Sequence, residues 1–499
     1  MESASLSYRG HRYPVEVISH CVWLYHRFPL SFREVEELLL QRGVIVSYET
    51  ARRWCAKFGR AYANGLRRRR LRPGDKWLYR CAKQDPERRF HALYGHVSRR
   101  DVLWRAWSGV CANRGAPGVD GVTVDAVAAA GVEEFLRDLS QQLRARTYRP
   151  SPLRQVMIPK PGRPGEFRRL SIPTVADRVV MTAAKLVLEP VFEADFLPVS
   201  YGFRPKRSAI HACESVRVEA NRGREWVLEA DIRDCFGSIR HDALVAQVAR
   251  RVVDGPMLTL IGMWLRAGVL EDGATGSAGA GTPQGSPISP LLANIALHVL
   301  DAAWQRGGHR LGVLVRYCDD FVILCPTRER AERARELASM VLASLGLLLH
   351  PGKTGIVHLA RGGQGFDFLG FHHRKVESWR RRGRFHLQRW PSKRAIGVLR
   401  DKIRAATDRR QVGRPLTAVV ADLNPVLRGW AAYFRWGNSA GKFSTIDSYV
   451  HERLAIFDNC KRGIPGRSWG QRHDGAWFDR LGVFRLSGNV RRVAAHAGR

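Results

Sequence analysis

Two neighbouring aspartates interrupt an apolar run in the middle of this chain. Asp319 and Asp320 lie in VLVRYCDDFVILC (313–325), whose other members are mostly Val, Leu, Ile and Phe. A carboxylate in such a run loses its hydration unless a cation compensates it. Successive strand residues point to opposite faces, so one ion pair with the nearby Arg316 does not satisfy both acids. A tight turn between two strands, with divalent cations at its tip, fits the pattern better.

A third acid, Asp231, has a similar setting in WVLEADIRDCF (226–236). Hard cations such as magnesium prefer oxygen ligands and are usually held by one or two carboxylates plus substrate phosphates. Two strands that each deliver acid to one cleft would meet that demand. The pattern therefore favours metal-dependent chemistry on phosphates. The structural alternative for these acids is a surface turn or a buried salt bridge.

The elements that must position these acids are short strands between helices. Four segments have the composition of strands: 151–160, 167–174, 226–236 and 313–325. Long helices are expected over 175–194 and 208–220, and basic helices follow residue 393. The predicted fold class is α/β, with a sheet that presents acid to a cleft and with helical ends.

The net charge indicates the partner. The 499 residues include 82 Lys and Arg against 46 Asp and Glu, a formal charge of +36, so a polyanion such as nucleic acid is expected. The length predicts several domains. No apolar run is long enough for a bilayer and MESASLSYRG is no apolar signal region, so we expect a cytoplasmic protein without membrane contact. Nine cysteines stand singly without a CxxC pair, which argues against zinc.

The first part of the chain has a helical pattern of its own. Within 13–70, SFREVEELLLQRG places Val35, Leu38 and Leu39 on one face, and Ser47 is a good N-cap for a second, basic helix, TARRWCAKFG. Helix, turn and basic helix predict a helix-turn-helix. A small helical bundle of another kind explains the same residues equally well. An arginine run then predicts a basic linker up to residue 75.

Ordered sequence blocks fill most of the remaining chain. In order they are GAPGVDGVTVD (115–125), IPKPGRPGEFRRLSIPTVADRVV, YGFRPKRSA, ADIRDCF, GTPQGSPISPLLANI (281–295), RYCDDFVIL, LGLLLHPGKT, FDFLGF, PSKRAI and LRGWAAYF. From about residue 78 on, the chain thereby resembles the reverse transcriptase and maturase proteins encoded within bacterial group II introns. The resemblance implies a right-hand polymerase with an α+β palm, which copies intron RNA into DNA, assists intron splicing and supports retromobility.

The resemblance also implies a division into domains. It predicts an N-terminal extension (78–150), fingers and palm (151–375), a thumb and maturase (X) domain (376–465) and a basic C-terminal tail (466–499). Residues 1–75 resemble instead the helix-turn-helix of DDE transposases of the insertion-sequence-6 type, followed by the linker. No transposase triad can be assembled here. This segment is therefore either a real fusion or a recombination product whose helices add only DNA affinity, and whether they bind DNA is left open.

The family mechanism assigns the metal ligands. Asp231 and Asp319 resemble the acids that bridge two magnesium ions (Mg2+), the carbonyl of Ile232 is expected to join the second ion, and Asp320 completes the site as the third acid. Asp231, Asp319 and Asp320 are thus the implied catalytic residues.

Other roles follow from the same resemblance. Lys160 and Arg168 resemble cations that grip the incoming triphosphate. Phe236 resembles the aromatic gate that excludes a 2'-hydroxyl, although a plain core phenylalanine is the alternative. Gln284 is expected beneath the nascent base pair, with Pro283 and Gly285 fixing its backbone. Lys353 resembles the lysine that neutralises or protonates pyrophosphate, although it is otherwise one more solvated lysine.

The thumb region is expected to bind intron RNA. Arg428 and Arg435 lie among the aromatics of RGWAAYFRWGN, which suits stacking and phosphate contact, although in a helix half of those aromatics must be core. The partners implied are group II intron RNA, a DNA target and primer, and dNTPs; a homodimer is left open.

Two departures and three alternatives accompany the resemblance. Cys318 stands where relatives commonly have Ala, and Gly237 stands where they commonly have an acid. No cysteine follows Cys460, so we expect no zinc-bearing endonuclease. Priming would then depend on single-stranded or already nicked DNA. The alternatives are a splicing maturase with an inactive polymerase, which the intact acids argue against, a host-defence reverse transcriptase, and a transposase-derived DNA-binding protein.

Overall fold

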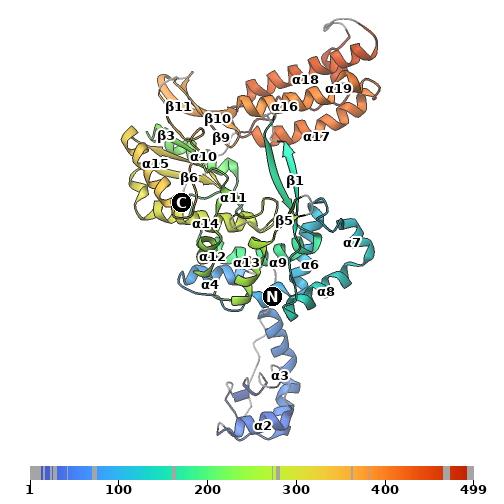
Figure 1. The fold of residues 1–499 in the computed structure, drawn as a ribbon, viewed down its shortest axis with the longest axis vertical. Coiled ribbons are helices and arrows are strands. Elements are labelled where there is room, and N and C mark those ends of the chain that lie inside the picture. Colours follow the sequence, from blue (N-terminus) through green and yellow to red (C-terminus); the bar gives the residue numbers. More distant parts are fainter. Residues whose placement is uncertain are drawn as a thin grey trace. The chain divides into compact units, whose positions relative to one another are not determined.

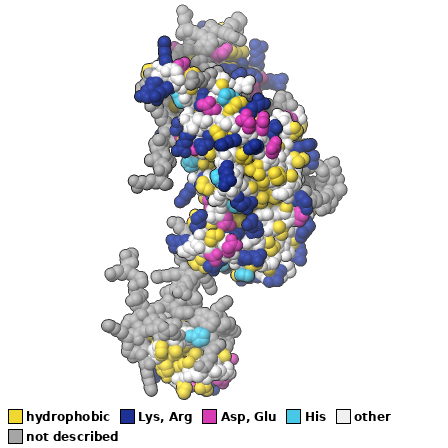
Figure 2. Space-filling model, turned by 90° about the vertical axis from the view of Figure 1, so that its left-hand side faces the viewer, with side chains coloured by type: hydrophobic (Ala, Val, Ile, Leu, Met, Phe, Trp, Pro, Cys, Tyr) yellow, Lys and Arg dark blue, Asp and Glu magenta, His cyan; other side chains and the backbone are white. Residues whose placement is uncertain are grey.

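The protein divides into two compact units, residues 1–77 and 78–499, each described here by itself. The computed structural model (Figure 1) describes residues 13–14, 17–18, 20–22, 25, 31–41, 43–69, 76–159, 165–271, 274–276, 281–360, 363–379, 381–464 and 472–491. On the face shown in Figure 2, Lys and Arg side chains are spread widely instead of forming one patch.

The first unit contains the predicted pair of helices, α2 (Phe32–Leu40) and α3 (Tyr48–Arg69). Ser31 caps α2 in a capping box with Glu34, and the hydroxyl of Ser47 accepts the N–H of Thr50 at the start of α3. Val35 and Leu39 pack in one buried core with Trp54 and other residues of α3, and Leu38 packs against that core. The two helices lie where the pair was predicted. The helix-turn-helix assignment itself stays a prediction, and most of the predicted linker lies outside the described residues.

The second unit begins with helices and a small sheet. The helices are α4 (Lys76–Gln84), α5 (Tyr94–Val97), α6 (Arg100–Ala112), α7 (Val124–Ala130) and α8 (Val132–Ala145). The strands are β1 (Leu153–Pro159), β2 (Phe167–Ile172), β4 (Val269–Glu271) and β5 (Ala274–Gly276), in the order β2-β1-β4-β5. The antiparallel pair β1 and β2, with Ile158 opposite Arg168, confirms the first two predicted strands.

A second sheet forms the centre of this unit. Its strands are β3 (Trp226–Asp231), β6 (Val313–Tyr317), β7 (Asp320–Cys325) and β8 (Gly355–His358), all antiparallel in the order β6-β7-β3-β8. The helices of this region are α9 (Val175–Glu193), α10 (Ala209–Asn221), α11 (Cys235–Ser238), α12 (His241–Ala249), α13 (Gly255–Arg266), α14 (Ser289–Arg306), η1 (Gly308–Arg310) and α15 (Arg328–Ala343). Because α10 and α15 pack on β7, its residues from Phe321 to Cys325 are all buried, which explains their continuous apolar run.

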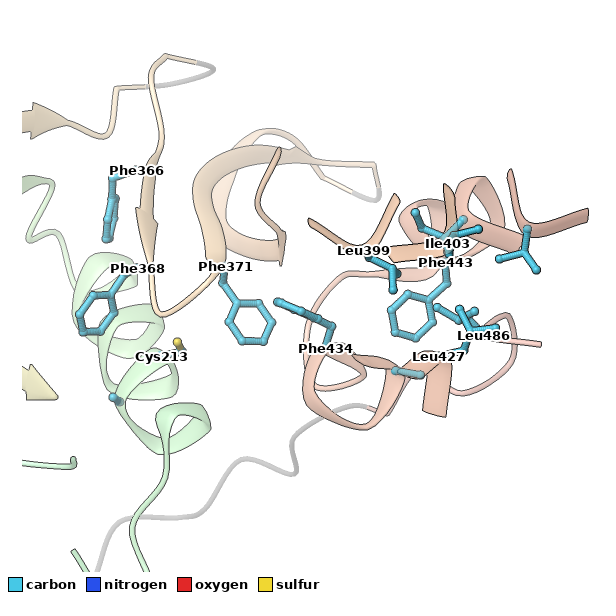
Figure 3. Close-up of a cluster of buried hydrophobic side chains, with 14 of the residues drawn as sticks. Cys213, Phe366, Phe368, Phe371, Leu399, Ile403, Leu427, Phe434, Phe443 and Leu486 are labelled. Carbon is cyan, nitrogen blue, oxygen red and sulfur yellow. The ribbon is translucent and has the colours of Figure 1, made fainter. Parts of the chain in front are cut away.

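A third sheet leads to the helical end of the chain. Its strands are β9 (Phe366–Phe368), β10 (Phe371–Ser378) and β11 (Arg381–Pro391), in the order β11-β10-β9. The helices that follow are α16 (Lys393–Ala406), η2 (Arg409–Gln411), α17 (Leu416–Phe434), α18 (Ala440–Lys461) and α19 (Gly475–Arg480). One apolar core joins Cys213 of α10 to Phe371, Phe434 and Phe443, so the sheet and the helices are packed together (Figure 3).

The described part of the C-terminal segment is not a free tail. Residues 466–499 were predicted as a basic tail, but residues 472–491 include α19, and Phe478 and Leu486 are buried in the core with α17 and α18. Two spaced apolar residues are a weak sequence signal in a basic segment, which is why the packing was not foreseen. The predicted boundary between 375 and 376 falls inside β10.

The cysteines and the lengths of the apolar helices can be compared with what the composition predicted. All nine cysteines are free thiols, seven buried and two half-buried, as expected of small apolar residues. Among the described residues, no helix combines the length and the apolar character needed to cross a bilayer.

Candidate active site

The tip of the β6–β7 hairpin carries the two neighbouring aspartates. Tyr317 pairs with Asp320, which leaves Cys318 and Asp319 as a two-residue turn. Cys318 has a φ of +59°, a conformation that tight hairpin turns require at their first central position. The predicted tight turn between two strands is confirmed.

Pairing between β3 and β7 brings the third acid to the same place. Asp231, the last residue of β3, lies directly opposite Asp320, so three carboxylates from two distant segments share one end of the sheet. Asp231 and Asp319 line a cleft of about 1060 Å³. Asp320 joins them in an adjoining cleft of about 670 Å³. The sequence separation of almost 90 residues is closed by strand register alone.

These acids hold more negative charge than their surroundings neutralise. Burial raises the pKa of Asp319 above its usual range, and nearby Asp231 adds to the effect. Burial, followed by the charges of Asp319 and Asp231, raises the pKa of Asp320 to about 7. Lys353 forms an ion pair with Asp231. The donors are all carboxylate oxygens, which suit a hard divalent cation.

The side chains are not arranged as a closed metal cage. In the part of the chain that is described, no three His, Cys, Asp or Glu side chains are close enough to enclose an ion. Lys353 occupies one oxygen of Asp231 in this conformation, and it lies in the same cleft. The three carboxylates therefore line open clefts, and one of them is already paired with Lys353.

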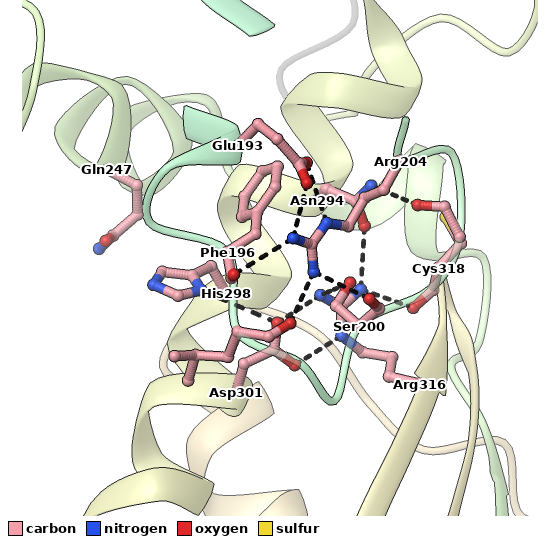
Figure 4. A network of polar contacts seen from close by, with 12 residues as sticks. Glu193, Phe196, Ser200, Arg204, Gln247, Asn294, His298, Asp301, Arg316 and Cys318 are labelled. Atoms are coloured by element: carbon pink, nitrogen blue, oxygen red, sulfur yellow. Dashed lines mark hydrogen bonds and ion pairs between the residues drawn. The ribbon is translucent and has the colours of Figure 1, made fainter. Parts of the chain in front are cut away.

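A buried network of polar contacts around Arg316 supports the Cys318–Asp319 turn (Figure 4). The Arg316 guanidinium forms an ion pair with Asp301 of α14 at 2.5 Å, and it donates to the carbonyl of Cys318 at 3.0 Å and to Asn294 at 3.1 Å. Arg316 therefore neutralises Asp301 and stabilises the turn instead of compensating the two aspartates. A Cβ at Gly202 would lie 2.6 Å from the Cys318 nitrogen, so the YGF loop needs glycine to pack against this turn.

The large cleft also collects four of the predicted substrate residues. Arg168 of β2, Phe236 of α11, Gln284 and Lys353 all line it together with Asp231. Arg168 is exposed, and its charge opposes the upward shift in the pKa of Asp319. Phe236 and Gln284 are half-buried, and Lys160 lies outside the described residues.

The Pro283–Gly285 turn has the unusual backbone that the sequence predicted. Gly285 has a φ of +114°, and a Cβ there would lie 2.7 Å from the carbonyl of Ser171. The carbonyl of Gln284 accepts the N–H of Ser171 at 2.6 Å, so the turn is attached to the end of β2. Glycine is required here both for conformation and for close approach.

The two thumb arginines lie on a different surface. Arg428 is exposed and lies over the ring of Phe484, and the half-buried Arg435 lies over Trp436. Neither lines the two clefts that hold the acids. Phe434 is buried in the core and the half-buried Trp430 packs against it, whereas Tyr433 is partly exposed and Trp436 lies half-buried under Arg435, so about half of the four aromatics belong to the core, as expected.

Sequence reasoning missed several residues beside the acids. Glu229, Asp367 and Arg394 line the smaller cleft with Asp320. Burial, with a further contribution from Asp367, raises the pKa of Glu229 to about 7. The period of two along β3 was the available signal, because it places Glu229 on the same face as Asp231. Asp367 and Arg394 gave no such signal, since their position depends on how the third sheet packs.

Palm-like sheet, acid-bearing hairpin, finger strands and helical thumb together define a polymerase of the right-hand class. Residues 158–373 match the family described as "Reverse transcriptase (RNA-dependent DNA polymerase)". Residues 396–473 match "Group II intron, maturase-specific domain". The chain belongs to the group II intron type of reverse transcriptase, with a maturase-specific domain after the polymerase.

Individual relatives agree with this family. Protein YkfC of Escherichia coli (strain K12) is 35% identical over 345 residues, which are 61% of this chain and 88% of that protein. The group II intron-encoded protein LtrA of Lactococcus lactis subsp. cremoris is 37% identical over 212 residues, 42% of this chain and 35% of that protein. A solved telomerase from Candida albicans has 13% identity and a TM-score of 0.36 over 66% of this chain and 63% of its own, too low to support an argument.

Proposed function

We propose that this reverse transcriptase copies RNA into DNA by metal-dependent nucleotidyl transfer, with Asp231, Asp319 and Asp320 as its catalytic acids. The observation that carries the proposal is the convergence of these three carboxylates at one end of the β3–β7 pair, beside a cleft that also holds Arg168 and Lys353. Neither acid-bearing segment alone provides such a site.

Asp231, Asp319 and Asp320, with the carbonyl of Ile232, are the groups that would hold two Mg2+ ions in this proposal. The carbonyl of Asp231 accepts the N–H of His350 on the β8 side. Because strand carbonyls alternate in direction, that of Ile232 is directed toward the opposite side, where the Cys318–Asp319 turn lies. When bound, the ions would lower the pKa of a primer hydroxyl and stabilise the pyrophosphate leaving group.

The remaining cleft residues are proposed to bind the nucleotide. Arg168, with Lys160, binds the triphosphate through charge-assisted hydrogen bonds. Phe236 packs against the sugar and leaves no room for a 2'-hydroxyl, and Gln284 supports the base pair from its turn. Lys353, which is already within reach of Asp231, moves to the phosphates and holds a proton for the leaving group.

The maturase half of the proposal concerns intron RNA. Arg428 and Arg435 are proposed to bind it on the thumb surface, where each stacks on an aromatic ring. This binding would assist splicing, and together with a DNA target, a primer and dNTPs it would support retromobility. The exposed bases of α3, Arg52 and Arg53, are proposed to add DNA affinity.

Primer extension on an RNA template with magnesium tests the polymerase. The Asp319→Ala variant should lose incorporation, whereas Asp138→Ala, which removes an exposed acid of α8, should retain it. Equal incorporation by wild type and Asp319→Ala would refute the catalytic assignment.

Splicing of an intron RNA by the same variants tests the maturase. Asp319→Ala should splice like wild type because its RNA surface is intact, and Arg428→Glu with Arg435→Glu should impair splicing. Loss of splicing in a folded Asp319→Ala protein would show that the two functions are not separate.

A further inference from the structure

The turn between β10 and β11 presents an aromatic and several basic side chains to solvent. Ser378 pairs with Arg381 across the turn, and Trp379 beside it has 86% of its surface exposed, the largest value among the exposed apolar residues described. Arg381, Arg382 and Arg384 are exposed as well, and none forms an ion pair with another described residue. An aromatic ring this exposed contributes little to folding, which points to an intermolecular role.

The same polarity continues along the outer face of the hairpin. From Arg384 the alternation of β11 places His386 and Gln388 on one face, and Gln388 pairs with the exposed Arg374 of β10. Arg384 and Gln388 are four residues apart, roughly 13 Å along the strand. Among the described residues of the turn, the one acid is Glu377, which accepts the N–H of Gly383 at 2.6 Å. The outer face is therefore a short basic track that ends at Trp379.

The opposite face fixes the hairpin to the palm. His373, Lys375, Leu387 and Arg389 are buried there. Arg389 forms an ion pair with Glu214 of α10 at 3.1 Å, Lys375 pairs with Glu225, and the N–H of Leu387 donates to Asn221 at 2.8 Å. Because these contacts already hold the hairpin in place, its outer face loses little conformational freedom when a ligand binds.

We propose that the β10–β11 hairpin is a second RNA-binding site, at which Trp379 stacks on an unpaired base while Arg382 and Arg384 bind the adjoining phosphates. It deepens the proposed function, because it adds a site for the same RNA outside the catalytic cleft. Exposed aromatic rings stack on single-stranded bases, whereas bases in a duplex must first be unstacked, so the track fits a single strand. RNA is favoured over DNA because this class of enzyme takes up RNA as its template.

Photocrosslinking of the full-length protein tests the site directly. The catalytic cleft is first filled with a short RNA–DNA primer–template, and a short single-stranded RNA of mixed sequence containing 4-thiouridine is then added. Mass spectrometry should locate a crosslink at Trp379 or its neighbours. Trp379→Ala should weaken binding of this second RNA about tenfold, the loss of one base–aromatic stack. Its extension of the short primer–template should remain that of wild type.

Matched variants separate the site from bulk charge. Arg382→Glu with Arg384→Glu should weaken the second RNA at least as much as Trp379→Ala. Arg137→Glu with Arg144→Glu, two exposed arginines of α8, makes the same charge change and should leave binding almost unchanged. Equal weakening by both pairs, crosslinks only elsewhere, or equal competition by single-stranded DNA would overturn the proposal. Failure of wild-type primer extension would instead contradict the polymerase mechanism.

Discussion

The β6–β7 hairpin carries charge on two sides of its turn, and the two groups of charges have opposite environments. Arg316 and Asp301 are both fully buried, and they form an ion pair that also satisfies Ser200, Asn294 and the Cys318 carbonyl. On the other side, Asp319 and Asp320 share a cleft with Asp231, and burial and mutual repulsion raise the pKa of both.

The difference separates charge that supports the fold from charge that we propose serves catalysis. Burial alone would raise the pKa of Asp301, but the Arg316 guanidinium lowers it below its usual range, so folding favours the ionised pair. The proposed catalytic acids Asp319 and Asp320 show the opposite direction, and folding therefore works against their ionisation. The first group stabilises the hairpin, and the second is placed there at a cost in stability.

Removing one catalytic acid should have the largest effect on activity and little effect on stability. Asp319→Ala should abolish primer extension, because metal ions supply several kcal/mol of transition-state stabilisation. At neutral pH the variant should unfold at the same denaturant concentration as wild type or a higher one, since one repelling carboxylate is gone. A markedly lower midpoint would show that Asp319 also supports the fold.

Breaking the buried pair should do the reverse. Arg316→Met leaves Asp301 buried without its cation and should lower the free energy of unfolding by about 3–5 kcal/mol. Chemical denaturation followed by circular dichroism measures this loss. Replacing both partners, Arg316→Met with Asp301→Leu, should recover much of it, and a double variant as unstable as the single one would contradict the explanation.

A buried histidine provides a smaller and pH-dependent case. Burial, together with the charge of Arg389, lowers the pKa of His373 to about 3, from about 6.5 in the unfolded chain. Below pH 6.5 the unfolded state gains a proton that the folded state does not, so stability falls as the pH drops from about 6.5 toward 3. At pH 5 this histidine lowers the free energy of unfolding by about 2 kcal/mol relative to neutral pH.

The His373→Phe variant should remove this pH dependence. Phenylalanine keeps the stacking on Phe366, whose ring centre lies 5.0 Å away, but it does not titrate. The difference between unfolding midpoints at pH 8 and pH 5 should be smaller for the variant than for wild type. An unchanged difference would mean that His373 is not the responsible group.

The smallest effect on stability is expected at Lys353. Its ion pair with Asp231 is partly exposed, and such pairs contribute about 0–1 kcal/mol. Lys353→Met should therefore unfold almost like wild type, while primer extension should fall by about 100-fold if the lysine donates a proton. If Lys353 is only a solvated lysine, primer extension should not change in the variant. If it donates a proton, the rate of primer extension should no longer depend on pH in the variant.

Much of this fold could be predicted because its signals are local. The apolar runs that become β3, β6 and β7, the helices over 175–193 and 209–221, and the turn around Gly285 follow from composition, capping and backbone preference. That the three acids would meet was also predictable, since carboxylates inside apolar strands are costly and demand a partner. Their catalytic role stays a proposal. Arg428 and Arg435 as RNA ligands, and the DNA affinity of α3, stay predictions.

What the sequence by itself determined is where strands, turns and acids lie along the chain, because these depend on residues a few positions apart. Tertiary structure alone decided which distant groups meet. Strand register placed Asp231 opposite Asp320, helix α14 supplied Asp301 to Arg316, and packing of the last helices buried Phe478 and Leu486. Such contacts depend on long-range packing, and no local pattern encodes the partner of a side chain.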